Sequence, residues 1–235
     1  MTPSKSTLDR LPNGLSAHWE AQRPRLEDAL RKQETVPPEA VSMAVSLDGV
    51  MAPMKDGKRQ GTRQDARSKG QSPSGPSGYQ DVGCGTVSSY DRFGERLVTR
   101  RMARMPETNK ATLTSQLTHE VIGALIARPD GRVVKVADGA ADNWTYLSET
   151  LPLGAEAVDF SHATAHLSDA LKAAYTEGTP AYQERLTTLR EVLRATPQGV
   201  DKVIDALGRL RSRSPRRQAL HKTIAYCREH RHRRR

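Results

Sequence analysis

The chain has 235 residues, of which 36% are hydrophobic and 4% aromatic, and 37 Lys and Arg outnumber 27 Asp and Glu for a net charge of +10. With two cysteines and no apolar stretch long enough to cross a bilayer, we expect neither a disulfide framework nor a membrane protein. The positive charge favours a polyanionic partner, because bound phosphates release counterions; the plainer alternative is a basic protein without one. The N-terminus lacks the apolar core of a signal peptide, so we expect a cytoplasmic protein.

The N-terminal segment, 1–40, is predicted to hold one helix. Residues 15–33 place apolar side chains at helical spacing among many charges, which indicates a partly exposed helix that ends before Thr35-Val-Pro-Pro-Glu39. The first strand follows over 41–48. Residues 55–78 contain almost no apolar side chain, and their Lys, Arg, Gly, Ser and Pro content predicts a flexible or disordered basic loop.

The rest of the 41–161 core is predicted to alternate strands and helices. We expect a hairpin with its turn at Asp91-Arg-Phe-Gly94, then a helix, a strand, a short helix and a last strand. The predicted ranges are 83–90, 95–102, 106–126, 132–138, 143–151 and 155–160. The order β-β-β-α-β-α-β predicts an α/β (α+β) protein with a ribonuclease-H-like mixed sheet.

An all-α region is predicted over 162–235. Residues 162–175 form its first helix, and three pairs of a hydroxyl residue followed by Pro indicate later helix starts near 180, 197 and 215. These pairs are Thr179-Pro180, Thr196-Pro197 and Ser214-Pro215.

Two β-prone runs end in Asp-Gly, at Asp48-Gly49 and at Asp138-Gly139. A carboxylate at the end of each of two neighbouring strands would hold Mg²⁺ or Mn²⁺ for phosphoryl transfer, in a site where two ions lie about 3.5–4 Å apart. The alternative is that each Asp only forms a turn. In the predicted strand order, these residues occupy the positions of the first two metal ligands of a ribonuclease-H-like fold.

Asp159, His162 and His166 lie at the junction between the last strand and the helical region. They would orient the substrate or a ligand carboxylate; the alternative is that Asp159 caps the helix and the histidines are structural. His162 and His166 have the spacing of zinc ligands, but no further ligand stands at a convincing distance. Cys227 and His230 form a weaker pattern, for which we expect a solvated basic tail.

Basic side chains are concentrated in the loop after Asp48 and near the C-terminus. They would contact DNA phosphates, or, alternatively, belong to solvated helix faces and a frayed end. The predicted DNA contacts are Lys55, Lys58, Arg59, Arg211, Arg213, Arg216, Arg217, Arg231, Arg233 and Arg234.

Four segments together carry a family likeness: 45–57, 83–91, 136–144 and 158–167. They resemble bacterial insertion-sequence transposases of the ISKra type, which are similar to the Mutator-like group of DDE transposases, and the likeness runs from about residue 6 to residue 232. The resemblance implies that Asp48 and Asp138 are the first two catalytic acids. It also implies that Asp159 and His162 belong to an acid-x-x-His element, and that the later helices form an insertion before the last catalytic segment.

The chain departs from this family in two places. Ala165 stands where the family usually carries Glu, and the third catalytic acid belongs to a Gly-Ser-Gly-rich segment beyond the Arg-His-Arg-rich helix, which the sequence does not include. The resemblance therefore predicts a truncated, nucleoid-associated transposase, inactive or weakly active, whose partners are transposon ends and target DNA. Two alternatives stay open. One is a non-enzymatic DNA-binding remnant that regulates a full-length transposase, through shared ends or through homo- or mixed oligomers. The other is a stand-alone nuclease that uses Asp142 or Asp159.

Overall fold

The computed structural model describes residues 5–33, 35–53, 58–71, 79–210 and 217–233. Contacts divide the chain into two units, Met1–Pro38 and Glu39–Arg235. The first unit contains helix α1 (Lys5–Gln33), which begins earlier than the sequence predicted. Leu15 and Trp19 are exposed on it, as expected of a partly exposed helix. Among the described residues, no helix combines the length and the apolarity needed to cross a membrane.

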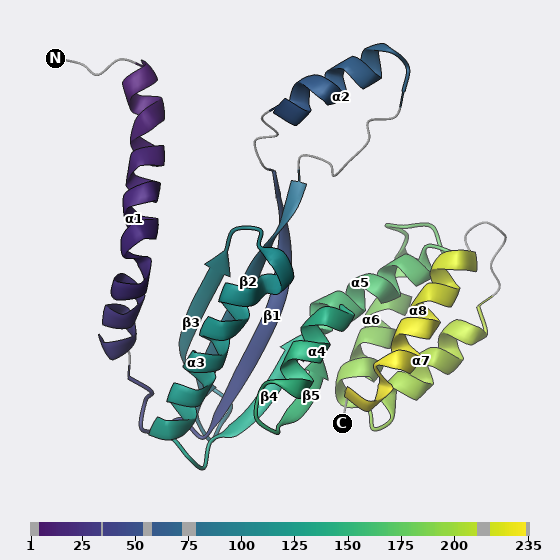
Figure 1. Ribbon diagram of the computed structural model, residues 1–235. Helices are drawn as coiled ribbons and strands as arrows, with labels where there is room; N and C mark the ends of the chain where they lie inside the picture. Colours follow the sequence, from purple (N-terminus) through teal and green to yellow (C-terminus); the bar gives the residue numbers. More distant parts are fainter. Residues whose placement is uncertain (1–4, 34, 54–57, 72–78, 211–216, 234–235) are drawn as a thin grey trace. The chain divides into compact units, whose positions relative to one another are not determined.

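The second unit is built on a five-stranded mixed sheet with the order β3-β2-β1-β4-β5 (Figure 1). Strands β1 (Ser42–Pro53), β2 (Tyr79–Tyr90) and β3 (Arg96–Arg104) are antiparallel neighbours. Strand β4 (Arg132–Ala137) runs parallel to β1, and β5 (Ala155–Val158) runs parallel to β4. The predicted mixed α/β architecture with a mixed sheet is therefore confirmed.

One face of this sheet is buried under two helices. Met43, Val45 and Leu47 alternate with more exposed residues along β1 and are 3% exposed or less, as the period of two in a strand requires. Helix α3 (Ala111–Ala127), preceded by the short 3-10 helix η1 (Thr108–Lys110), packs on β2 and β3. Helix α4 (Ala141–Glu149) contacts β1 and β4. This face forms the core of the sheet.

Two predictions between β1 and β2 are wrong. Strand β1 does not end at Asp48 but continues to Pro53, paired with the first residues of β2. The predicted loop over 55–78 contains helix α2 (Lys58–Ser68), which is polar on all sides. Its Lys, Arg, Gln and Ala favour a helix by intrinsic propensity, whereas our prediction relied on the lack of an apolar stripe.

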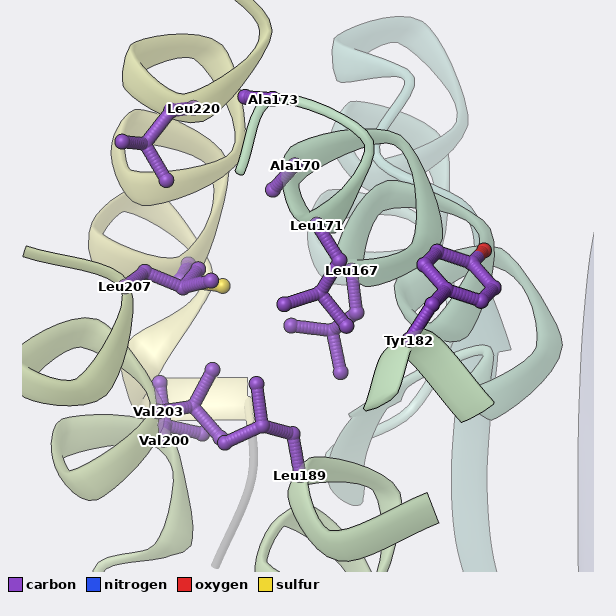
Figure 2. Close-up of a cluster of buried hydrophobic side chains, with 11 residues drawn as sticks. Leu167, Ala170, Leu171, Ala173, Tyr182, Leu189, Val200, Val203, Leu207 and Leu220 are labelled. Carbon is purple, nitrogen blue, oxygen red and sulfur yellow. The ribbon is translucent and has the colours of Figure 1, made fainter. Parts of the chain in front are cut away.

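The later helices pack around a core of their own. They are α5 (Phe160–Leu171), α6 (Pro180–Ala195), α7 (Gly199–Gly208) and α8 (Arg217–Glu229), followed by the 3-10 helix η2 (Arg231–Arg233). Their buried side chains meet in one cluster (Figure 2), which consists of Leu167, Ala170, Leu171, Ala173, Tyr182, Leu189, Val200, Val203, Leu207, Leu220 and Cys227. The prediction of an all-α region is confirmed.

The three predicted helix starts have different outcomes. Thr179 caps α6, since its side chain accepts a hydrogen bond from Tyr182 N and Pro180 occupies the first helical position. Thr196 does not cap α7, because α7 begins at Gly199, after Gln198 in a left-handed conformation with φ of 56°. Ser214-Pro215 lies outside the described residues.

Candidate functional site

The parallel pairing of β1 with β4 places Asp48 and Asp138 at corresponding positions on neighbouring strands. Leu47 opposite Ala137 is the last pair of this ladder, so the next residue on each strand is one of the two predicted acids. Each acid is followed by glycine, and β4 ends here while β1 continues. The sequence prediction that the two carboxylates belong to neighbouring strands is thus confirmed.

Hydrogen bonds hold one oxygen of each carboxylate. Asp48 is exposed, and its Oδ1 accepts from Gly49 N at 2.7 Å. Asp138 is half-buried, and its Oδ1 accepts from Ala140 N at 3.0 Å and from Asn143 Nδ2 at 3.2 Å. Within the described part of the chain, hydrogen bonds reach only Oδ1 of each acid. Oδ2 of each therefore stays available for a ligand.

Helix α4 fixes the main chain around Asp138. Trp144 Nε1 donates to Asp138 O at 2.6 Å, and Asn143 Nδ2 also approaches Leu47 O at 3.4 Å. Asn143 is 2% exposed, and from inside the protein its side chain bridges the middle of β1 and the residue that follows β4. The sequence reasoning missed this role, although Asn143 and Trp144 lie in one of the segments that carry the family likeness.

Two further charged residues complete the surroundings of the acid pair. Lys110 Nζ donates to Asn143 Oδ1 at 3.0 Å and lies 3.5 Å from Asp81 Oδ2. The Asp81 carboxylate lies directly over Gly49, where a Cβ atom would collide with it. A cleft of about 770 Å³ opens here, lined among others by Leu47, Asp81, Lys110 and Asn143. No sequence signal marked Asp81 or Lys110, because neither belongs to a recognisable motif.

Cys84 lies opposite Asp48 in the β1–β2 ladder. Burial raises the pKa of its thiol, and the negative charges of Asp48 and Asp81 raise it further. Both effects disfavour the thiolate, so the site offers carboxylates rather than a sulfur nucleophile.

Helices α5 and α8 bring an aromatic cluster to the other side of Asp138. The rings of His162 and His166 lie 4.9 Å apart, His166 stacks on Tyr226 at 4.1 Å, and Tyr226 meets His230 at 4.8 Å. Gly139 lies against this cluster, since its Cβ position is 2.5 Å from Tyr226 Cε2 and 3.1 Å from His230 Nε2. Burial lowers the pKa of His166, as does the neighbouring His162, and burial also lowers the pKa of His230. Both shifts favour the neutral forms of His166 and His230, and the cluster packs against the loop after β4 at Gly139.

Asp159 takes the structural role that the sequence left open. Its Oδ1 accepts from Ser161 N at 2.7 Å, which caps α5, and its own N–H donates to Ala137 O at 2.8 Å. It thereby ties the start of α5 to the end of β4, beside the acid pair.

The predicted basic tail is solvated only in part. Cys227 and His230 are 9% and 4% exposed, which contradicts our expectation for these two residues, whereas Arg228, Arg231 and His232 are exposed. Arg233 bonds Glu156 at 3.0 Å and lies 4.2 Å above the ring of Trp144. The expectation failed at these positions because one side of the segment packs against other elements.

The other predicted DNA contacts are distributed as follows. Arg231 pairs with Asp201 at 2.8 Å and Arg217 is exposed. Lys58 and Arg59 begin α2. The remaining ones lie outside the described residues: Lys55, Arg211, Arg213, Arg216 and Arg234.

The donor set fits a hard divalent cation. Mg²⁺ is commonly bound by one or two carboxylates, with water and phosphate oxygens completing its shell, and Asp48 and Asp138 supply such a pair. Among the described residues, no group of three or more His, Cys, Asp and Glu side chains is placed to hold a metal ion. A third oxygen would therefore have to come from elsewhere.

Comparison with protein-family models finds no match to this chain, and comparison with curated proteins finds none either.

Proposed function

We propose that the chain is a DDE-type DNA transposase of an insertion sequence, in a form that is inactive or weakly active by itself. The observation that supports the proposal is the register of β1 and β4, because its last pair, Leu47 and Ala137, is followed on each strand by one of the two acids, and each acid keeps one oxygen without a hydrogen bond among the described residues. The order β3-β2-β1-β4-β5 also supports a ribonuclease-H-like fold, because its first three strands are antiparallel and the last two run parallel to the first.

In this proposal Asp48 and Asp138 hold Mg²⁺ or Mn²⁺ through their available oxygens. When bound, the metal would activate the attacking oxygen and stabilise the leaving one during hydrolysis at an element end and during attack of the freed 3′-hydroxyl on target DNA. Asn143 and Trp144 keep the Asp138 segment in place, and Asn143 also lines the cleft beside Lys110, although neither acid does.

Low activity is part of the proposal. The resemblance calls for three catalytic acids, whereas only Asp48 and Asp138 are assigned here, and two carboxylates hold a second metal ion poorly. The described end of that helix lies next to the site, because His230 touches Gly139 and Arg233 covers Trp144. Robust strand transfer by the purified 235-residue chain would contradict this part.

Metal binding tests the acid pair directly. We expect the wild type to bind Mn²⁺ in electron paramagnetic resonance titrations, and Asp48→Asn and Asp138→Asn each to weaken binding strongly. Asp142→Asn is the matched control, since Asp142 is exposed on the neighbouring helix. Equal binding by all four proteins would refute the proposed site.

A non-enzymatic DNA-binding remnant is the second candidate. It is favoured by a separate cleft of about 1160 Å³, whose lining includes Arg194, Arg228, Arg231 and Arg233. This candidate predicts DNA binding that weakens steeply with salt and survives Asp48→Asn and Asp138→Asn. Fluorescence anisotropy at several salt concentrations measures both, and binding that does not depend on salt would exclude phosphate contacts.

A further inference from the structure

The turn before α3 has an unusual backbone. Asn109 and Lys110 both adopt left-handed conformations, with φ of 56° and 51°. Non-glycine residues seldom occupy this region, and consecutive ones persist only where the surrounding structure holds them, often beside a functional site. The turn directs the Lys110 side chain over Gly83, whose Cβ position is 3.5 Å from Cγ and Cδ of that lysine. The left-handed backbone of the turn and the missing side chain of Gly83 thus both allow this placement of the Lys110 side chain.

The ammonium group at the end of this side chain determines how Asn143 is oriented. An ammonium can only donate hydrogen bonds, so the atom 3.0 Å from Lys110 Nζ is the carboxamide oxygen of Asn143. The amide nitrogen then points the other way, toward two acceptors, Asp138 Oδ1 and Leu47 O. Asp81 holds the ammonium from the far side at 3.5 Å.

Each partner of Asn143 is needed because the residue is only 2% exposed. Without Lys110, its carboxamide oxygen would stay buried without a hydrogen bond, and the side chain would be free to turn away from Asp138. Residues that orient the ligands of a metal site typically affect its affinity through this kind of contact.

From this geometry we infer that Lys110 is a positioning residue which, acting through Asn143, holds the carboxylate of Asp138 in place directly after β4. Lys110, Asn143 and Asp81 form a clamp that joins β2 and α4 to Asp138, directly after β4, and reaches the middle of β1 at Leu47 O. The inference rests on the proposed function, because it assigns the clamp to the same acid pair.

Hydrogen exchange on the metal-free protein tests whether the clamp holds this segment. Lys110→Met keeps an apolar stem of similar length and removes the ammonium. We expect amides of residues 138–144 to exchange faster than in the wild type. Lys172→Met is the matched control, because Lys172 also pairs with two acids, Asp169 and Glu177, and does so in another part of the protein. Unchanged exchange in Lys110→Met would overturn the inference.

Mn²⁺ affinity then separates positioning from a purely structural role. We expect Lys110→Met to bind Mn²⁺ about 10–100-fold more weakly than the wild type. Lys172→Met should keep wild-type affinity, and Lys110→Arg should recover part of the loss because a guanidinium also donates to the Asn143 oxygen. Where Lys110→Met does not fold, Asn143→Ser serves in its place. We expect the same faster exchange and the same weaker Mn²⁺ binding, and the comparison with Lys110→Arg is then left out.

The outcomes distinguish the two proposals. Faster exchange with unchanged Mn²⁺ affinity means that Lys110 only stabilises the fold, and the inference fails while the proposed function stands. A wild type that binds no Mn²⁺ refutes the proposed function, and the exchange result alone then decides whether the clamp exists.

Discussion

Replacing Gly139 with alanine tests the close approach of α8 to the loop that follows Asp138. The added Cβ would lie 2.5 Å from Tyr226 Cε2 and 3.1 Å from His230 Nε2. The tyrosine ring has little room to retreat, because it stacks on His166 at 4.1 Å and meets His230 at 4.8 Å. Gly139→Ala should therefore separate the helix from the loop or displace the whole cluster.

The expected cost follows from two opposing effects. Overpacking of a filled interior costs about 1–3 kcal/mol. Alanine at this position also stabilises the folded state by about 0.4–1 kcal/mol, because it has fewer conformations in the unfolded chain than glycine. The balance is a loss of about 1–2 kcal/mol in the free energy of unfolding. For a chain of this size, that lowers the midpoint of thermal unfolding by about 2–8 °C.

Thermal unfolding followed by circular dichroism measures this shift. Gly123→Ala is the matched control, because Gly123 lies inside α3 and a Cβ there meets no atom within 4 Å. Alanine should stabilise that helix by about 0.5–1 kcal/mol. If Gly139→Ala unfolds at or above the wild-type temperature while Gly123→Ala behaves as expected, the packing of α8 on this loop is refuted.

Leu207→Ala should lower the free energy of unfolding by about 2–5 kcal/mol, because Leu207 is 0% exposed. Leu153→Ala is the control and should change it by less than about 0.5 kcal/mol, because Leu153 is 96% exposed. Urea unfolding of the two variants measures both values. Thr179→Ala should cost about 1 kcal/mol in the same assay through loss of the α6 cap, and Thr196→Ala, which removes no cap, clearly less. Burial and the neighbouring histidine lower the pKa of His166 below its usual value of 6.5. The folded state therefore disfavours its protonated form, and stability should fall as the pH drops below about 6.5. Thermal unfolding from pH 8 to 5 should show this fall, and His166→Gln should make it shallower.

The sequence predicted the sheet well because its strands are short apolar runs separated by clear turns. Asp48 and Asp138 could be placed on neighbouring strands because each ends such a run and is followed by glycine. The continuation of β1 to Pro53 could not be predicted, since residues after Asp48 pair with β2 through backbone hydrogen bonds that leave little trace in the side-chain pattern. Helix α2 was missed for a related reason, because it has no apolar stripe.

The surroundings of the acid pair were harder to predict than the pair itself. Asp81 and Lys110 contribute through contacts between residues that are distant in the sequence, and neither carries a local signal. Thr179 and Thr196 precede proline in the same way, yet only Thr179 caps a helix, because Gln198 starts α7 from a left-handed turn instead. The burial of His230 was also unpredictable, since a stretch rich in Arg and His has the composition of a solvated terminus.

The parallel pairing of β1 with β4 has a consequence for how the protein folds. The two acids are far apart in the sequence, and α2, β2, β3, α3 and β4 lie between them along the chain. Contacts of high sequence separation form late, because the entropy of closing a long loop must be overcome before they are gained. The acid pair should therefore appear only after the antiparallel strands β1, β2 and β3 have folded. While β4 is still inside the ribosome, the β1–β4 ladder that precedes the two acids cannot form.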